Sequence, residues 1–332
     1  MRFARFLVSR LITWFLVIWI GMTIVFFVPR FLPSDPISAA LGRVTSSGST
    51  MTPEQVTAMR NTLMQLYGLQ GTLPEQYINF MSRALLTGNF GQSLSFYPMP
   101  VNQLIAQSLP WTVFLLLTST IIAWVVGNFI GLLTGYRSNK FYSKALEGIA
   151  IFIYPIPYYI LALILIILFV YINPIFPISF SVKGAPWSLQ FIGSAIFNSI
   201  LPGLSIIVGA FGWWILSMKA LSSSVAEEDF VNFARMKGVS NGTIMRRYVL
   251  RNAILPQITL LAISIGTIFN GALIAEILFG YPGLGTLTYT AVVQTDYNLL
   301  MGTISISIIA VATAALVVDL IYPLFDPRIQ YR

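Results

Sequence analysis

Long apolar runs divide this 332-residue chain into segments of membrane-spanning length. Charged residues are absent from six stretches, 11–29, 84–136, 148–182, 184–218, 252–275 and 297–318. A membrane-spanning helix needs about 20 consecutive, mostly apolar residues. The pattern therefore predicts an all-α polytopic membrane protein with six transmembrane helices, at 9–30, 110–135, 147–172, 197–218, 256–278 and 302–324.

Composition agrees with this fold class and excludes several functions. Hydrophobic residues make up 56% of the chain and charged residues 9%, against roughly 25% charged in soluble domains. The net charge of +8 comes from basic residues in short loops beside apolar runs, so it does not indicate nucleic-acid binding. The chain has no Cys and no His, which excludes thiolate metal sites and the commonest general base. An intramembrane hydrolase is therefore disfavoured.

The distribution of Lys and Arg predicts the orientation of the spans. Of the 19 basic residues, 14 lie at the two termini, in the loop after 110–135 or in the loop after 197–218. Cytoplasmic loops are enriched in basic residues, so we expect both termini inside. The first apolar run could instead be a secretory signal, but it is long for one and no small-residue cleavage site follows it. We expect a retained helix over residues 1–30.

The segment 31–108 is expected outside the membrane. Within it, five apolar residues recur with helical spacing, and Gly88 is placed to end the helix: Tyr77, Phe80, Met81, Ala84 and Leu85. This helix could pack on the tops of the spans, or it could serve as a lid or docking surface. Domain 109–332 follows, with five helices and a cytoplasmic loop over 219–256.

The segment between the last two spans, "FGYPGLGTLTYTAVVQTDYN", contains three glycines and a proline within six residues. Such a cluster indicates turns. It predicts a plain loop, or a loop that dips back toward the pathway, because irregular backbone is tolerated at membrane depth where it lines a cavity.

One connector is unusually charged. Residues 226–256 hold eight of the 30 charged residues. Ser224 and Glu227 have capping-box spacing, acidic residues follow, and Gly238 is placed as a left-handed helix terminator. We predict a cytoplasmic helix at 225–237 with an apolar face, followed by a second helix from 243 into the next span. A capped connector without further function would show the same signals.

Three stretches resemble a known family. They are "EEDFVNFARMKG", "LPEQYINFMSRALLTGNFGQSLSFYPMPVNQLIAQSLPWTVFLL", and the last third of the chain from "EILFGYPGLGTLTYTAVVQTDYNLL" to "VVDLIYPLFDPRIQYR". Together with the first span they resemble the permease subunits of bacterial ABC importers, in the dipeptide/oligopeptide/nickel branch. The first stretch departs from the general EAA-loop pattern: only Ala234 and Gly238 keep their identity, and Leu250-Arg251 stands where that pattern has Leu-Pro.

The resemblance implies a type I importer fold and a coupling helix that docks on an ATPase subunit. The residues it assigns to this docking are Glu228, Asp229, Phe230, Phe233, Ala234, Arg235 and Gly238. It further implies a second permease subunit, two cytoplasmic ATPase subunits that bind ATP and Mg²⁺, an external solute-binding protein, and a place in a bacterial or archaeal cytoplasmic membrane. This chain itself is expected to bind no cofactor or metal and to be non-catalytic. No lysine follows a glycine, so the chain has no phosphate-binding loop of the ATPase type.

The translocated solute is expected to be a peptide, with an oligosaccharide as the alternative. The residues expected along the pathway or at its outer gate are Asn270, Glu276, Tyr281, Pro282, Gly283 and Gly285. An ion-driven secondary transporter is the competing class, since such proteins carry ionisable groups within their spans. The candidates here, Glu276 and Asp319, lie near span ends, where nearby polar groups could satisfy them.

Overall fold

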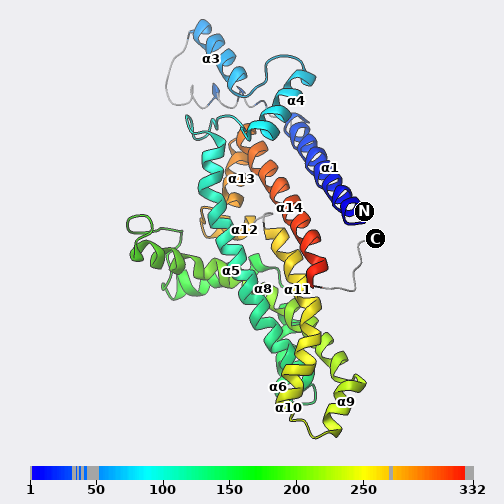
Figure 1. Cartoon of the computed structure of the whole chain (residues 1–332). Helices are drawn as coiled ribbons and strands as arrows, with labels where there is room; N and C mark the ends of the chain where they lie inside the picture. The colour runs from blue at the N-terminus through cyan, green and yellow to red at the C-terminus, as the bar shows by residue number, and fades with distance from the viewer. Residues whose placement is uncertain are drawn as a thin grey trace.

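The computed structural model describes residues 2–31, 35, 37, 38, 41, 42, 52–268 and 272–325. These residues form helices and one isolated antiparallel bridge. The elements are α1 (Arg2–Phe31), α3 (Pro53–Leu66), α4 (Leu73–Ser82), η1 (Arg83–Thr87), α5 (Val101–Tyr136), α6 (Phe141–Ile153), α7 (Tyr158–Ile166), η2 (Ile167–Ile172), α8 (Leu189–Ala226), α9 (Asp229–Met236), α10 (Asn241–Thr243), η3 (Ile244–Val249), α11 (Leu250–Thr267), α12 (Leu273–Leu278), α13 (Leu284–Val293) and α14 (Tyr297–Phe325). Figure 1 shows an elongated molecule with α3 and α4 at its upper end and α9 and α10 at its lower end.

The described residues contain five or six candidate spans, in agreement with the predicted all-α polytopic fold. Within the described residues, five helical segments are long and apolar enough to cross a membrane: Arg5–Phe31, Val101–Tyr136, Leu189–Ala226, Asn241–Gly266 and Tyr297–Leu320. A sixth span is available if a bent helix pair is counted as one. The boundary expected between residues 108 and 109 falls inside α5.

The third span differs from the straight helix predicted at 147–172. Helix α6 and the α7–η2 helix meet at an angle of 95°. The break contains Pro155 and Pro157. Proline has no N–H to donate to the carbonyl four residues earlier, so two prolines so close together end one helix before the next begins. Figure 1 shows the second half projecting sideways from the long axis of the molecule.

The fifth span ends earlier than predicted. Helix α11 ends at Thr267, and residues 273–278 belong to the separate short helix α12. Asn270, one of the expected pathway residues, lies outside the described residues.

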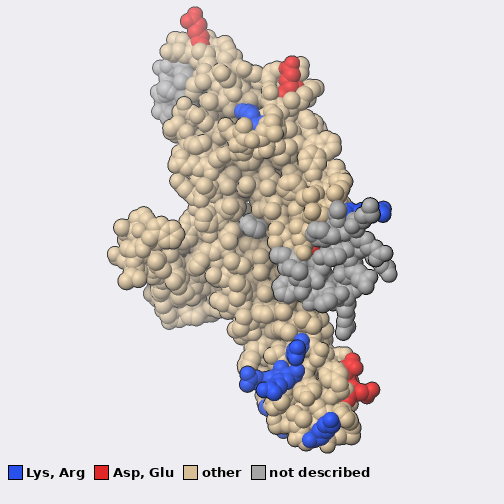
Figure 2. Space-filling model, viewed as in Figure 1, with Lys and Arg blue, Asp and Glu red and all other residues tan. Residues whose placement is uncertain are grey.

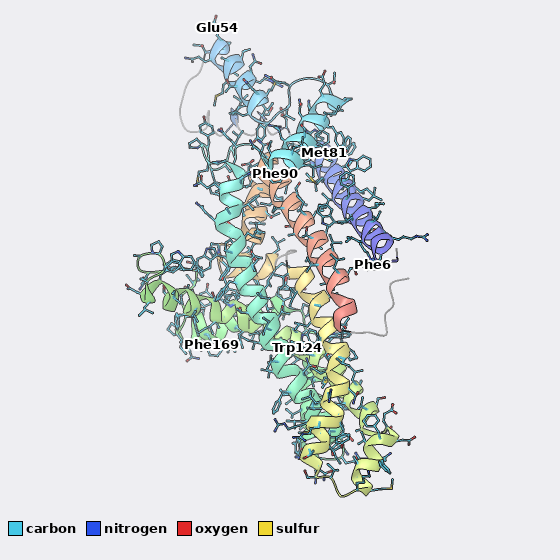
Figure 3. The ribbon with its side chains drawn as sticks, viewed as in Figure 1. Phe6, Glu54, Met81, Phe90, Trp124 and Phe169 are labelled. Carbon is cyan, nitrogen blue, oxygen red and sulfur yellow. The ribbon has the colours of Figure 1, made fainter. Side chains whose placement is uncertain are left out.

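The predicted outer helix is present as α4 and η1, and Gly88 ends it with a φ of 62°. Phe80, Met81 and Ala84 are buried in the core cluster at this end of the molecule, whereas Leu85 is exposed. The widened turn of η1 changes the helical register, which rotates Leu85 away from the predicted face. Met81 and Phe90, labelled in Figure 3, mark this cluster between α4 and the upper ends of the spans.

Helices α5 and α8 form the most extensive helix–helix contact among the described elements. Three glycines spaced four residues apart on α5 lie against α8: Gly127, Gly131 and Gly135. Small residues with this spacing allow two backbones to approach closely within a membrane. On another side of α5, the Trp124 indole N–H donates to the backbone oxygen of Gln257 in α11, 3.1 Å away (Figure 3). Helix α5 therefore contacts both α8 and α11 in the lower half of the molecule.

Candidate functional site

The charged connector forms the short helix α9, but it begins later than predicted. Helix α8 continues to Ala226, Glu227 ends it, and Glu228 is the N-cap of α9. The expected capping box of Ser224 and Glu227 was wrong, because Ser224 lies inside α8 and its carbonyl accepts the Glu227 N–H. The following helix is as predicted, with α10, η3 and α11 forming one continuous helical stretch.

Helix α9 has two different apolar faces. Val231 and Ala234 are buried and belong to one cluster with residues of α5, α8, η3 and α11. Phe230, Phe233 and Met236 are 43%, 55% and 78% exposed. Burying a valine side chain stabilises the fold by about 1.5 kcal/mol or more, so the inner face fixes α9 to the ends of three long helices. The other face is largely exposed, with the Lys237 ammonium 4.6 Å from the centre of the Phe233 ring.

The polar residues that the family resemblance assigns to ATPase docking lie around the exposed face of α9. Glu228, Asp229 and Arg235 are exposed, and the Arg235 guanidinium donates to the Asn232 side-chain oxygen at 3.0 Å. Gly238 has a φ of 74°, the left-handed conformation predicted for it. Figure 2 shows basic side chains gathered at the lower end of the molecule beside the acidic residues of α9. Ala234, by contrast, packs inward and contributes no surface.

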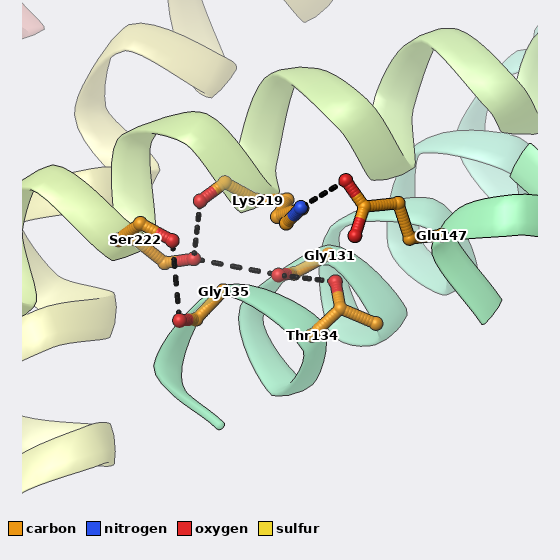
Figure 4. A network of polar contacts seen from close by, with 7 residues as sticks. Gly131, Thr134, Gly135, Glu147, Lys219 and Ser222 are labelled. Atoms are coloured by element: carbon orange, nitrogen blue, oxygen red, sulfur yellow. Dashed lines mark hydrogen bonds and ion pairs between the residues drawn. The ribbon is translucent and has the colours of Figure 1, made fainter. Parts of the chain in front are cut away.

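A polar network joins the helices just above α9 (Figure 4). The Ser222 hydroxyl of α8 lies 3.3 Å from the carbonyl oxygen of Gly131 on α5, and the Ser223 hydroxyl donates to Gly135 at 3.1 Å. Lys219 of α8 forms an ion pair with Glu147 of α6. The side chains of both partners are more than half buried. The network therefore ties α5, α6 and α8 together at the end that carries α9.

The segment predicted as a loop between the last two spans is largely helical. Helices α12 and α13 form a hairpin (272–293) that packs on α5 and α14. The turn between the two helices contains Gly280, with a φ of 57°, and Gly283, the N-cap of α13. The rest was missed because contacts with neighbouring helices override the weak helical preference of a Thr- and Val-rich stretch.

Five of the six expected pathway residues lie together where α12 meets the start of α13. Glu276 is fully buried, and its carboxylate accepts hydrogen bonds from the backbone N–H groups of Gly285 and Thr286, at 2.7 and 3.2 Å. A Cβ atom on Gly283 would overlap this carboxylate. The Tyr281 side chain is fully buried, with its hydroxyl 3.1 Å from the Ser199 hydroxyl. Pro282, beside them, is partly buried.

An apolar cavity of about 500 Å³ lies between α1, α14 and the α12–α13 hairpin. Gly285 is part of its wall, together with Leu273, Leu284 and Thr288. Arg10 and Asp319 form an ion pair of 3.2 Å at its edge. Both acids that could have indicated an ion-driven transporter, Glu276 and Asp319, are thus satisfied by neighbouring groups.

The described residues thus form a helical bundle of five or six candidate spans, with the short helix α9 packed against one end of it. Comparison with known families gives the class. Residues 127–331 match the binding-protein-dependent transport system inner membrane component, and residues 3–116 match the N-terminal model of the same kind of membrane component. The chain belongs to this family and is the non-catalytic, multi-pass inner-membrane subunit of an ABC importer.

Curated relatives align along nearly the whole chain. The oligopeptide transport system permease protein AppB of Bacillus subtilis is 30% identical, with 95% of this chain and 96% of that protein covered. The dipeptide transport system permease protein DppB of the same organism is 28% identical, with 98% of each covered. The oligopeptide transport system permease protein OppB of Haemophilus influenzae is 26% identical, with 98% and 99% covered.

Sequence reasoning missed four contributors to these sites. Met236 continues the exposed face of α9 and could have been found from its spacing of three residues from Phe233. Val231 could have been found from the same spacing to Ala234. The Lys219–Glu147 pair and the contact of Glu276 with Thr112 on α5 join residues 72 and 164 positions apart. No local pattern in the sequence signals contacts of that kind.

Proposed function

We propose that this chain is the translocation subunit of a peptide importer, with the α9 end and both termini on the cytoplasmic side. Its α9 helix docks on a cytoplasmic ATPase subunit, and the α12–α13 hairpin is the outer gate of the pathway. A second permease subunit completes the pathway, and an external binding protein delivers the peptide. ATP-driven closure of two ATPase subunits moves α9 and switches the side of the membrane to which the translocation pathway opens.

The observation that carries the proposal is the pair of opposite apolar faces on α9. The inner face belongs to the core cluster of α5, α8 and α11, so a force on α9 reaches these helices directly. The outer face presents Phe230, Phe233 and Met236 beside acidic and basic residues. Such a mixture of an apolar centre and a charged rim is typical of protein interfaces. The peptide as substrate is supported by the relatives, which are named as oligopeptide and dipeptide permeases.

The exposed surface of Phe230 and Phe233 determines how much their truncation should weaken docking. About half of each phenylalanine surface is exposed. Full burial of such a side chain is worth about 1.5–3 kcal/mol, so covering the exposed half contributes roughly 0.8–1.5 kcal/mol per residue. Phe230→Ala with Phe233→Ala should therefore cost about 1.5–3 kcal/mol, which weakens ATPase binding by roughly ten- to 150-fold.

The test is co-purification and affinity measurement with the ATPase and permease subunits encoded beside this chain. Phe141→Ala is the matched control, because Phe141 is 86% exposed at the start of α6, outside α9. We expect the double variant to lose the ATPase subunits and the control to retain them. Equal binding by both variants would refute α9 as the docking helix.

The substrate is tested with proteoliposomes that contain the assembled complex and its binding protein. We expect ATP-dependent uptake of a labelled peptide. Uptake of an oligosaccharide in place of peptides would overturn the substrate assignment while leaving the importer intact. Uptake driven by an ion gradient without ATP would overturn both.

A further inference from the structure

The start of α13 is capped by side chains from two other elements. The N-cap residue of α13 is Gly283, which has no side chain. The Leu284 N–H instead donates to the Thr112 hydroxyl oxygen of α5 at 2.8 Å, and the next two N–H groups donate to the Glu276 carboxylate of α12. The Thr112 hydroxyl in turn donates to the other oxygen of Glu276 at 2.8 Å. The free N–H groups at this helix end are thus satisfied from α5 and α12 together.

The Glu276 carboxylate is held by neutral donors alone. In the part of the chain that the structure describes, the ion pairs are Arg10–Asp319 and Lys219–Glu147, and neither involves Glu276. The positive end of the α13 dipole favours an anion at this position. A buried carboxylate without its hydrogen-bond donors is costly, so Glu276 holds α13 in this one position relative to α5.

Thr112 is linked to the coupling end through α5 itself. From Thr112 to Gly131 the helix rises by about 28 Å, at roughly 1.5 Å per residue. At Gly131 and Gly135, α5 is in close contact with α8, which leads directly into α9. A displacement of α8 by α9 therefore moves α5, and Thr112 is the point at which α5 is hydrogen-bonded to the hairpin.

We propose that Thr112 and Glu276 are positioning residues. Their hydrogen bonds join α5 to the α12–α13 hairpin, and we call this link the latch. Motion at α9 controls the outer gate through it. This inference rests on the proposed function. While the latch is intact, ATP hydrolysis and movement of the hairpin occur together. When the hydroxyl of Thr112 is removed, α5 moves without the hairpin, and hydrolysis is no longer matched by transport.

The experiment uses the assembled complex in proteoliposomes with its binding protein and a labelled peptide. Thr112→Val removes the hydroxyl at nearly constant volume, and Thr112→Ser restores it. Thr118→Val is the matched control, because the Thr118 hydroxyl bonds only carbonyl groups of its own helix, at 2.6 and 3.2 Å. We expect Thr112→Val to lower peptide uptake per ATP hydrolysed by at least about fivefold, the lower end of usual coupling factors. Thr112→Ser and Thr118→Val should behave like the natural chain.

Amide hydrogen exchange on the purified chain gives a readout that needs no partner protein. Thr112→Val should speed exchange in 284–293 and leave 229–236 unchanged. The latch is refuted if the uptake-to-hydrolysis ratio is unchanged in Thr112→Val, if Thr112→Ser is as impaired as Thr112→Val, or if exchange in 284–293 is unaltered. A complex of the natural chain that does not hydrolyse ATP would instead refute the proposed function, and the exchange result would still decide the latch.

Discussion

Substitution of Gly131 by alanine tests how closely α5 must approach α8. A Cβ atom at this position would lie 2.6 Å from the carbonyl oxygen of Ile215, 2.7 Å from the Met218 Cβ and 3.1 Å from the Lys219 nitrogen. Two of these neighbours are backbone atoms of α8, which cannot rotate away as a flexible side chain can. The two helices must therefore separate.

The size of the effect is the difference between two opposing contributions. Overpacking a close contact costs about 1–3 kcal/mol, and the upper end applies where the backbone must move. Alanine regains about 1 kcal/mol over glycine in a helix interior. The net loss is about 2 kcal/mol, which lowers the unfolding temperature by about 4–8 °C at roughly 2–4 °C per kcal/mol.

The matched control is Gly193→Ala in α8, where a Cβ atom would meet nothing within 4 Å. That variant should be as stable as the natural chain or slightly more stable. Membrane proteins often unfold irreversibly, so the temperatures at which half of the detergent-purified protein is lost are compared at one heating rate. A half-loss temperature of Gly131→Ala equal to that of Gly193→Ala would refute the close-contact argument.

Three further substitutions test other parts of the molecule. Gly238→Ala forces alanine into a φ of 74°; it should cost about 1–2 kcal/mol and speed amide exchange in α9, whereas Gly238→Asn should recover part of the loss. Lys219→Met should destabilise the fold more than Lys219→Met combined with Glu147→Gln. Thermal unfolding of the single and double variants should give a coupling energy of about 0.5–3 kcal/mol. Additive losses of stability would contradict the ion pair. Asp296→Ala removes the acceptor for the Leu299 N–H at the start of α14 and for the Ser93 hydroxyl and Ser95 N–H; the lost N-cap alone costs about 0.5–2 kcal/mol, so exchange at 297–301 should rise, unlike after Glu54→Ala in exposed α3.

The spans and the charged connector could be predicted because their signals are local. Apolar runs without charge identify α1, α5, α8 and α14, because a membrane-spanning helix needs a long apolar stretch. The bounds are less accurate: α5 begins at 101 instead of 110, and α8 covers 189–226 instead of 197–218. The end of α9 followed from Gly238, because few other residues adopt its backbone conformation at low cost. The start of α9 did not, because the capping spacing of Ser224 and Glu227 also occurs by chance inside a long helix.

The α12–α13 hairpin could not be predicted because the groups that define it are distant in sequence. Nothing near Thr112 indicates that its hydroxyl lies at the end of a helix that begins at Leu284. The burial of Glu276 likewise depends on the absence of side chains at Gly283 and Gly285, which only the close packing of α12 and α13 explains. Helical periodicity carries no information about helix caps that are formed by residues distant in the sequence.

Acidic residues are buried at one proposed functional end of the molecule and exposed at the other. Among the described residues, Glu276 and Asp296 are the fully buried acids, and they lie on either side of α13. Glu276 links α13 to α5, while Asp296 accepts the Ser93 hydroxyl at 2.6 Å and the Ser95 N–H at 3.0 Å from the outer segment. The acids of α9, in contrast, are exposed. Buried anions held by neutral donors restrict a segment to one position, whereas exposed anions can exchange water for a partner's cations. Glu276 and Asp296 thus fix the hairpin at both of its ends, whereas the exposed acids of α9 are accessible to the partner that we propose for it.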